Sequence, residues 1–263
     1  MSCISVLVPT YKPGNYLKRC LESIESQTLS KDRFKVYIAL NGPSEVYQEF
    51  VVALLEQCTF RYEYIYLERA GVSRARNFLL ESSYGNYVAF VDDDDVLSSG
   101  YLEMLLSCAE DGFISVSDSK DFKCSVAEAT RNFVGNNFVR LKEKEESLFL
   151  SRKYFSSPWA KLIPRDLIGN VRFNEKLKVG EDSLFMAEIS KRVKGVKKAD
   201  EAACYYVYIR DGSASRKKAF LLEELRRIFY LACIYTKMLF QGYNIPFVLS
   251  RIAATLMHLR RIL

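Results

Sequence analysis

The sequence predicts an α/β protein with a doubly wound, mostly parallel sheet, and two observations support this class. Between residues 4 and 97, short apolar runs alternate with helical patterns, as in a parallel sheet with crossover helices. The expected strands are 4–8, 35–40, 62–67 and 87–91, and helices are expected around 17–24, over 45–57 and from 73 onward. Polar or acidic residues close three of these strands, at the edge where such sheets hold ligands.

Each element has a local reason. The first strand is a continuous apolar run suited to burial on both faces, and apolar residues recur at helical spacing over 17–24. Ser73 is the candidate N-cap of the third helix, because Ser favours that position. Later in the chain, Phe185, Ile189 and Val193 recur every four residues and predict another helix.

The loops after three strands carry candidate ligand-binding residues. These are Pro9, Thr10 and Tyr11, then Asn41, and then the acids at 92–95. Pro-Thr and Asn-Gly pairs also occur in ordinary turns, so the prediction depends on their succession at strand ends. A nucleotide lying across the three loops fits this arrangement.

Four consecutive carboxylates, Asp92, Asp93, Asp94 and Asp95, follow the fourth strand directly. Adjacent carboxylates repel each other, and partial burial would raise their pKa values. A divalent cation such as Mg²⁺ or Mn²⁺ would relieve the conflict, and diphosphate is its usual second partner. The alternative is a solvated acidic turn whose Asp residues cap the next helix.

Two acids later in the chain suggest proton transfer. Asp182 is expected in the first turn of its helix, where the helix dipole stabilises a carboxylate, and a general base would be held ionised there. The alternative is that Glu181 and Asp182 only favour that helix end. A strand at 203–209 is followed by Arg210 and Ser213, which are candidate phosphate donors.

The composition excludes several classes of site. His258 is the only histidine, which excludes Ser-His-Asp and Cys-His mechanisms and His-based zinc sites. Seven scattered cysteines without a C-x-x-C pair indicate reduced residues of a cytosolic protein. The first residues lack the basic and apolar regions of a signal peptide. Catalysis is therefore expected to use carboxylates, a metal ion and basic groups.

The last part of the chain differs in charge. Residues 216–263 hold nine Lys or Arg against two acids, a charge of +7, so the total of +6 leaves about −1 for residues 1–215. Two helices are expected at 220–240 and 246–263, and the longest uncharged stretch of the first, 228–236, is too short to span a membrane. The sequence thus predicts one domain over 1–215 and a basic, amphipathic helical tail.

An anionic membrane surface is the expected partner of this tail, because apolar helices with basic residues bind such surfaces. Two alternatives stay open: the helices pack on the domain, or they pack on a second copy of the chain to form a homo-oligomer. Nucleic acid is not expected, since the tail shows no platform of stacking side chains and no known binding motif.

Several stretches resemble one family. They are S-V-L-V-P-T-Y-K-P-G-N-Y (5–16), G-V-S-R-A-R-N-F-L-L (71–80), V-A-F-V-D-D-D-D (88–95), W-A-K-L (159–162) and G-E-D-S-L-F (180–185). In this order, over about residues 3 to 215, they resemble the family 2 glycosyltransferases of the GT-A fold that build bacterial capsule, O-antigen or teichoic-acid glycans. The resemblance implies a Rossmann-like, mostly parallel sheet with flanking helices and a C-terminal helical appendage.

The resemblance also implies roles for individual residues. It places Pro9, Thr10, Tyr11, Asn41, Arg76, Asn77, Asp92, Asp93, Arg210 and Ser213 at the nucleotide or its diphosphate, Asp94 at the metal with Asp92 and Asp95 as alternative ligands, Asp182 as catalytic base, and Trp159, Lys161 and Glu181 on the acceptor side. The chain departs from the family where Leu40 or Asn41 replaces a base-reading Asp, and where no His occurs over 210–215.

The expected activity is metal-dependent, inverting transfer of a sugar from a nucleotide-diphospho-sugar, UDP-linked, to a hydroxyl of a glycan or lipid-linked acceptor. The expected location is the inner face of the bacterial cell membrane. One alternative is a phosphohydrolase with the pattern D-x-D-x-V, which residues 92–96 fit, although that loop usually follows the first strand of its domain. Another is a non-catalytic membrane-surface protein that only binds nucleotide sugars.

Overall fold

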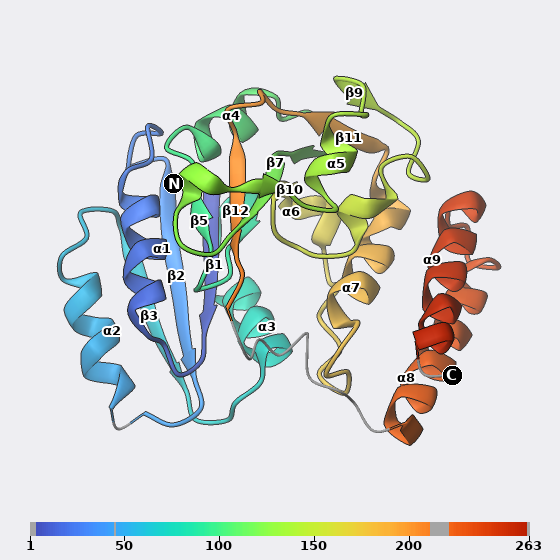
Figure 1. Ribbon diagram of the computed structural model, residues 1–263, viewed down its shortest axis with the longest axis horizontal. Helices are drawn as coiled ribbons and strands as arrows, with labels where there is room; N and C mark the ends of the chain where they lie inside the picture. Colours follow the sequence, from blue (N-terminus) through green and yellow to red (C-terminus); the bar gives the residue numbers. More distant parts are fainter. Residues whose placement is uncertain (1–3, 45, 211–220, 262–263) are drawn as a thin grey trace.

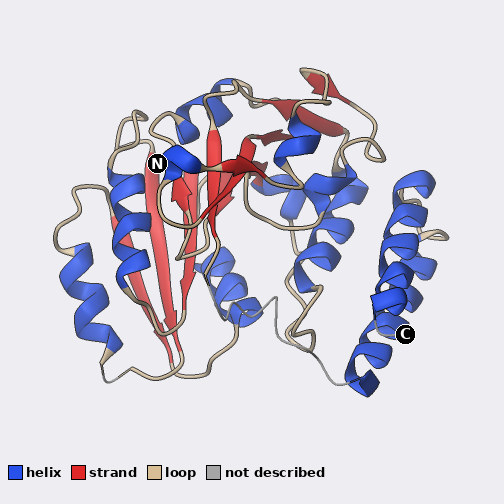
Figure 2. Cartoon of the chain, in the orientation of Figure 1, coloured by secondary structure: helices blue, strands red, loops and turns tan. Residues whose placement is uncertain are grey.

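An eight-stranded sheet passes through the molecule with helices on both faces (Figures 1 and 2). The computed structural model describes residues 4–44, 46–210 and 221–261. The strand order is β3-β2-β1-β4-β10-β6-β11-β9. Its strands are β1 (Ile4–Thr10), β2 (Phe34–Asn41), β3 (Tyr62–Leu67), β4 (Tyr87–Phe90), β6 (Phe113–Val116), β9 (Lys144–Glu145), β10 (Lys161–Pro164) and β11 (Gly195–Lys198).

The first four strands confirm the parallel sheet that the sequence predicts. β1 pairs in parallel with β2 and β4, and β2 pairs in parallel with β3. β10 then runs antiparallel to both β4 and β6, so the large sheet is mixed beyond this point. The carboxyl ends of β1, β2 and β4 consequently meet at one edge, as the argument from successive loops requires.

The two faces of the sheet form two hydrophobic cores. Side chains alternate along β1, so Leu7 joins one core while Val6 and Val8 join the other. The second core packs against α1 (Asn15–Glu25), α2 (Tyr47–Leu55) and α4 (Tyr101–Ser107). The first core packs against α3 (Val72–Ser82), α5 (Gly135–Phe138), α6 (Arg165–Ile168) and α7 (Glu181–Ile189).

A smaller sheet lies next to the large one and is not predicted from the sequence. Its order is β5-β12-β7-β8, formed by β5 (Val96–Leu97), β12 (Cys204–Tyr208), β7 (Asp118–Phe122) and β8 (Thr130–Arg131). β4 ends at Phe90 and β5 begins at Val96, so the acids at 92–95 lie on the connection between the two sheets. The sequence predicts only β12 among these strands, as the strand at 203–209; β5 and β8, with two residues each, are too short to show a period of two.

One local prediction is wrong, and a second is confirmed only in part. The N-cap of α3 is Gly71, at φ +154°, a conformation that side chains rarely adopt, and Ser73 lies within the first turn with its hydroxyl buried. Helix α7 ends at Ile189, a 3₁₀ turn follows, and Val193 is extended. Val193 is buried in the same core as α7, which explains its apolar spacing without a longer helix.

The tail forms α8 (Leu221–Met238) and α9 (Ile245–Met257), which pack beside α7 (Figure 1). Their inner residues Leu231, Tyr235, Met238, Phe247 and Val248 are buried in the same core as α7. Packing on the domain, one of the alternatives that the sequence leaves open, is therefore realised by the inner faces. Within the part of the chain that the structure describes, no helix has the length and apolar character to cross a membrane.

Candidate functional site

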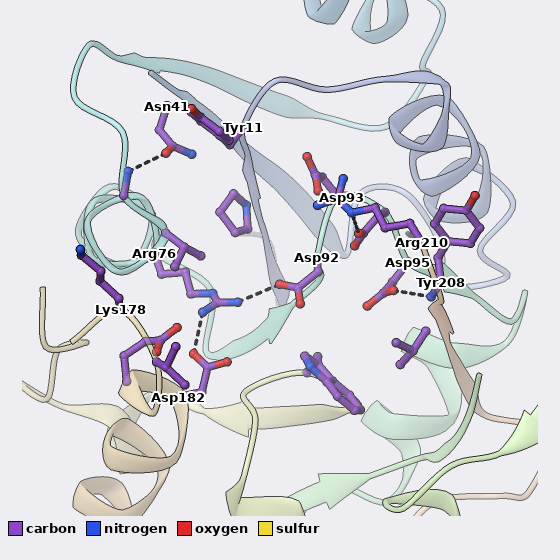
Figure 3. A pocket seen from close by; sticks show the side chains of 18 of the residues that line it. Tyr11, Asn41, Arg76, Asp92, Asp93, Asp95, Lys178, Asp182, Tyr208 and Arg210 are labelled. Atoms are coloured by element: carbon purple, nitrogen blue, oxygen red, sulfur yellow. Dashed lines mark hydrogen bonds and ion pairs between the residues drawn. The ribbon is translucent and has the colours of Figure 1, made fainter. Parts of the chain in front are cut away.

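A cavity of about 810 Å³ opens at the carboxyl ends of β1, β2 and β4 (Figure 3). Strand ends supply Pro9, Tyr11 and Asn41, and the connection between the sheets supplies all four acids at 92–95. Helices α3 and α7 and the end of β12 supply Arg76, Glu181, Asp182, Tyr208 and Arg210. Trp159 also lines the cavity, so one site contains residues from most of the stretches that the resemblance singles out.

A buried arginine joins two acids across this cavity. Arg76 Nη2 donates to Asp92 Oδ1 at 2.8 Å, and Arg76 Nη1 donates to Asp182 Oδ1 at 2.6 Å. The Arg76 side chain is only 4% exposed and lies 5.3 Å from the centre of the Phe173 ring. Burial raises the pKa of Asp182, while the Arg76 charge opposes that shift. The arginine therefore fixes the separation between the acid cluster and the N-terminus of α7.

The four acids alternate between two environments. Asp93 accepts a hydrogen bond from Thr10 Oγ1 at 2.5 Å, and Asp95 accepts one from the Tyr208 amide at 2.8 Å; both aspartates are buried. The Asp92 and Asp94 side chains are 31% and 17% exposed. Asp92 and Asp94 are thus the more exposed pair, a distinction that a run of identical residues does not show.

Burial places this cluster under electrostatic strain. Burial, together with the charges of Asp94 and Asp92, raises the pKa of Asp93 to about 7, and the hydrogen bond from Thr10 opposes this shift. Burial raises the pKa of Asp94 to about 6, with the Asp92 charge as the next cause. Arg210 Nε lies 3.1 Å from Asp94 Oδ2, and its guanidinium stands 5.0 Å from the centre of the Tyr16 ring. A positive charge close to these carboxylates stabilises their ionised form.

Asn41 lines the cavity with both ends of its amide engaged. Its Nδ2 donates to the Thr10 carbonyl at 2.7 Å, and its Oδ1 accepts from the Gly71 amide at 2.8 Å. The residue therefore ties the end of β1 to the start of α3. The Tyr11 side chain is 46% exposed and its ring packs against Gly42. A Cβ on Gly42 would lie 2.7 Å from the Tyr11 ring. Gly42 at φ +100° permits both the turn and this contact.

The chain is similar in sequence to known glycosyltransferases. The family model described as "Glycosyl transferase family 2" matches residues 5–168, more than half of the chain. The chain belongs to glycosyltransferase family 2. Glycosyltransferase GlyA of Streptococcus pneumoniae is 31% identical over 226 residues, covering 81% of this chain and 31% of GlyA. The chain spans 24% to 60% of the length of the first curated relatives that it matches.

Two solved structures share the fold of this family 2 chain. The S. aureus TarS 1–349 complex with UDP-GlcNAc has a TM-score of 0.77 at 21% identity, covering 97% of this chain and 72% of that one. The mannosyltransferase PcManGT from Pyrobaculum calidifontis, in complex with GDP-Man and Mn²⁺, has a TM-score of 0.61 at 16% identity, covering 97% and 74%. The GT-A fold expected from the sequence is thereby confirmed.

Three of the expected site residues of this family 2 chain, Thr10, Asn77 and Lys161, do not line the cavity. Asn77 exchanges two hydrogen bonds with the Phe173 backbone, at 2.9 and 2.7 Å, and Thr10 is bonded to Asp93. Lys161 is 1% exposed, and its Nζ donates to the carbonyls of Ser157 and Trp159. Burial lowers the pKa of Lys161 to about 7. Ser213 lies outside the described residues.

Other residues line the cavity without being expected there. They are Asp121, Ser156, Lys178, Val179, Val207 and Tyr208, among others. Asp121 is held by a 2.8 Å hydrogen bond from Asn132 Nδ2, and it lies on the small sheet that the sequence does not predict. Lys178 lies two residues before Gly180, on the loop that leads into α7. The sequence signal for Ser156, Lys178 and Val179 is their nearness to Trp159 or Asp182 along the chain. Val207 and Tyr208 lie on the expected strand before Arg210, and Asp121 has no such signal.

The donor set fits a hard divalent cation that is shared with a ligand. Over residues 4–44, 46–210 and 221–261, no three His, Cys, Asp or Glu side chains are grouped so as to hold a metal ion by themselves. Asp92 and Asp94 would thus supply one or two oxygens. Mg²⁺ and similar ions usually bind with one or two carboxylates plus phosphate oxygens and water, which matches this arrangement.

Proposed function

We propose that this chain is an inverting, metal-dependent glycosyltransferase that moves a sugar from a nucleotide-diphospho-sugar to a hydroxyl of a glycan acceptor. The observation that carries the proposal is the buried Arg76 bridge, 2.8 Å to Asp92 and 2.6 Å to Asp182. It holds an acid cluster suited to a metal and diphosphate at a fixed distance from one separate, partly buried carboxylate, that of Asp182. Inverting transfer needs these two functions on opposite sides of the reacting carbon.

The diphosphate end of the donor lies at the acid cluster in this proposal. Asp94, with Asp92 as second ligand, would hold Mn²⁺ or Mg²⁺, whose charge stabilises the leaving diphosphate. Arg210 is already within 3.1 Å of Asp94, so its guanidinium can turn to the phosphate oxygens. Asp93 and Asp95 keep the loop in place through Thr10 and the Tyr208 amide rather than by touching the donor.

Asp182 is the general base in this proposal. It takes the proton of the acceptor hydroxyl while that oxygen attacks the anomeric carbon from the face opposite the diphosphate. Burial raises the pKa of Asp182, which makes its carboxylate a stronger base near neutral pH. Glycosidases instead need two carboxyl groups flanking the scissile bond. Here the acids of the cluster serve the leaving group, so a single base is sufficient.

The acceptor lies against Trp159 and Glu181. Trp159 stacks on Tyr205, with centroids 5.2 Å apart and planes at 13°, so its position is fixed and its ring can support a sugar. Lys161 holds the carbonyls of Ser157 and Trp159 from behind, which makes it a support of this wall. Burial raises the pKa of Glu181 to about 7, so this residue can donate or accept a hydrogen bond to an acceptor hydroxyl.

A UDP-linked hexose or N-acetylhexosamine is the proposed donor, which the UDP-GlcNAc complex of TarS supports. Thermal unfolding with UDP, GDP, CDP and dTDP, with and without Mn²⁺, tests it. We expect UDP with Mn²⁺ to stabilise the protein by about 2.7 kcal/mol at a hundred times its Kd. Asp94→Ala should remove the dependence on Mn²⁺. No stabilisation by any nucleotide would contradict the proposal and favour the phosphohydrolase, whereas stabilisation without any sugar transfer would favour the non-catalytic alternative.

The phosphohydrolase alternative is less well supported by the topology. The D-x-D-x-V acids follow β4, the fourth strand in chain order, whereas such a loop usually follows the first. The acids also share a cavity with Asp182 and Trp159, neither of which that mechanism uses.

The proposed acceptor is a lipid-linked glycan of bacterial surface polysaccharide, reached at the inner face of the cell membrane. The outer faces of α8 and α9 expose large apolar side chains: Leu221, Leu222, Leu225, Phe229, Tyr230, Phe240, Ile245, Leu249, Leu256 and Met257. Arg226 and Lys237 are exposed among them, and the tail carries the basic excess of the chain. An apolar face with basic residues is complementary to an anionic bilayer.

Sedimentation with vesicles tests this surface. The full chain should bind vesicles of phosphatidylcholine mixed with phosphatidylglycerol, and bind phosphatidylcholine alone weakly. Replacing Phe229 and Phe240 with Ser should weaken binding, because both are exposed apolar anchors. Val52→Ser on α2 is the matched control. Unchanged binding, with a loss of self-association in the variant, would show that this face joins two copies of the chain instead.

A further inference from the structure

Helices α8 and α9 lie beside α7 (Figure 1), and they make polar contacts with both segments that form the acceptor side of the cavity. We propose that this helix pair positions the acceptor side, with Arg251 and Tyr235 as its two positioning residues. The acceptor side is defined here as residues 152–160 and 180–186. This proposal rests on the proposed function only in naming these residues the acceptor side. It gives the tail a role inside the reaction, beyond contact with a membrane.

Arg251 of α9 holds the first segment. The residue is 7% exposed; its Nη2 donates to the Arg152 carbonyl at 3.0 Å and its Nη1 donates to the Phe155 carbonyl at 3.2 Å. Nη1 is also 3.4 Å from Ser156 Oγ. These partners are all neutral oxygens, so a buried cation depends on their exact placement. Movement of this segment would leave the guanidinium unsolvated, and α9 therefore holds it firmly.

The segment held by Arg251 leads directly into the cavity. Ser156 lines it, and Trp159 lines it three residues later. Lys161 Nζ bonds the carbonyls of Ser157 and Trp159, so the chain between Ser156 and Trp159 has little freedom. The phenyl rings of Phe155 and Phe247 add an apolar contact, with centroids 5.0 Å apart. A displacement of α9 would therefore move the tryptophan wall.

Tyr235 and Leu231 of α8 hold the second segment. Tyr235 is 1% exposed, and its hydroxyl lies 3.3 Å from the Ser183 hydroxyl, one residue after Asp182. Gly180, the N-cap of α7, has φ +89°, and a Cβ there would lie 3.0 Å from Leu231 Cδ1. Leu231 thus packs closely against the backbone turn that presents Glu181 and Asp182 to the cavity.

These contacts couple the tail to the geometry of the reaction. The donor side, defined here as residues 71–77 and 92–95, is built on α3 and the connection between the sheets. A shift of α8 and α9 would move the base and the tryptophan wall relative to that side. Because displacement by 1 Å can cost on the order of 10²-fold in rate, tail position is expected to control turnover.

The single tryptophan of the chain provides the test, since Trp159 lies in the segment that Arg251 holds. Arg251→Met and Tyr235→Phe are compared with Ser250→Ala and Thr236→Ala, whose hydroxyls bond only within α9 and α8. Tryptophan emission and amide hydrogen exchange are measured on the full-length proteins. We expect shifted emission for Arg251→Met, faster exchange over residues 152–160 for Arg251→Met and over 180–186 for Tyr235→Phe, and unchanged controls. Arg251→Lys, which keeps the charge, should be intermediate.

Two outcomes would overturn the proposal. One is unchanged emission and exchange in folded Arg251→Met and Tyr235→Phe. The other is exchange that rises equally over 71–77 and 92–95, which would mean that the tail supports the whole fold and not the acceptor side. Tyr235→Phe removes only one hydroxyl, so it still tests the proposal if Arg251→Met does not fold. None of these measurements needs sugar transfer, so failure of the proposed function would be recognised separately.

Discussion

Asp182→Asn should lower the rate of sugar transfer by about 10²- to 10⁴-fold, the usual contribution of a general base. The amide oxygen of Asn can still accept the hydrogen bond from Arg76, which is 2.6 Å long in the wild type, but it cannot take a proton. Nucleotide binding should therefore persist. The measurement is release of nucleoside diphosphate from the donor identified by the unfolding screen, in the presence of acceptor.

Stability should change in the opposite direction. Burial raises the pKa of Asp182 in the folded state, which means that folding disfavours its charged form. A neutral amide avoids this cost, so Asp182→Asn should unfold at a temperature equal to or above that of the wild type. Asp166→Asn, at an exposed position in α6, is the control and should change neither quantity. Full transfer activity in Asp182→Asn would refute its role as base.

Arg76→Met should have the largest effect on stability. The substitution leaves Asp92 and Asp182 without their shared cation, and removing one partner of a buried ion pair costs about 3–5 kcal/mol. The two carboxylates are 31% and 23% exposed, so solvent reduces the expected loss to about 2–3 kcal/mol. Nucleotide binding should weaken as well, because the cluster gains net negative charge where the diphosphate binds.

The loss of stability in Arg76→Met should depend on pH in a defined direction. Burial raises the pKa of Asp182 and the Arg76 charge opposes that shift, so without Arg76 the pKa of the folded-state Asp182 rises further and the folded protein binds more protons than the unfolded chain. The variant should therefore be least impaired at low pH and most impaired once Asp182 is ionised. Urea unfolding at about pH 5 and about pH 8 measures this.

Arg74→Met is the matched control for Arg76→Met. Arg74 also lies on α3, but its side chain is 40% exposed. Its ion pair with Glu175 is long, with 4.0 Å between Arg74 Nε and Glu175 Oε2. The free energy of unfolding of Arg74→Met should fall by less than about 0.5 kcal/mol at either pH. A loss in Arg76→Met no larger than in Arg74→Met would show that the bridge does not stabilise the fold.

The first half of the fold can be predicted from sequence because its signals are local. Continuous apolar runs mark β1, β2, β3 and β4, and polar residues at their ends mark the edge that holds the cavity. Of the small sheet, only β12 could be predicted, as the strand at 203–209, because β5 and β8 have two residues each. Asp121 was missed because its strand, β7, was not predicted, whereas Tyr208 lies on the expected strand but nothing in the sequence indicates that it lines the cavity.

The internal organisation of the site depends on contacts between distant residues. Arg76 and Asp182 are 106 positions apart, and no pattern in the sequence indicates that one arginine would bridge Asp182 to Asp92. The alternation of buried and more exposed acids depends on where β4 ends and β5 begins. The amides of Asn41 and Asn77 likewise bind backbone groups that only the folded chain brings near.

The position of the acids between two sheets limits how this protein can diverge. Only residues 91–95 separate β4 of the large sheet from β5 of the small one, so the residues proposed to bind metal and diphosphate also form one of the short links between the two sheets. Insertion or deletion of one residue there would exchange the buried and exposed acids and shift the register of β5 against β12. New specificities are therefore expected to arise by changes in the loops that follow β7 and surround Lys178, while the length of this link stays constant.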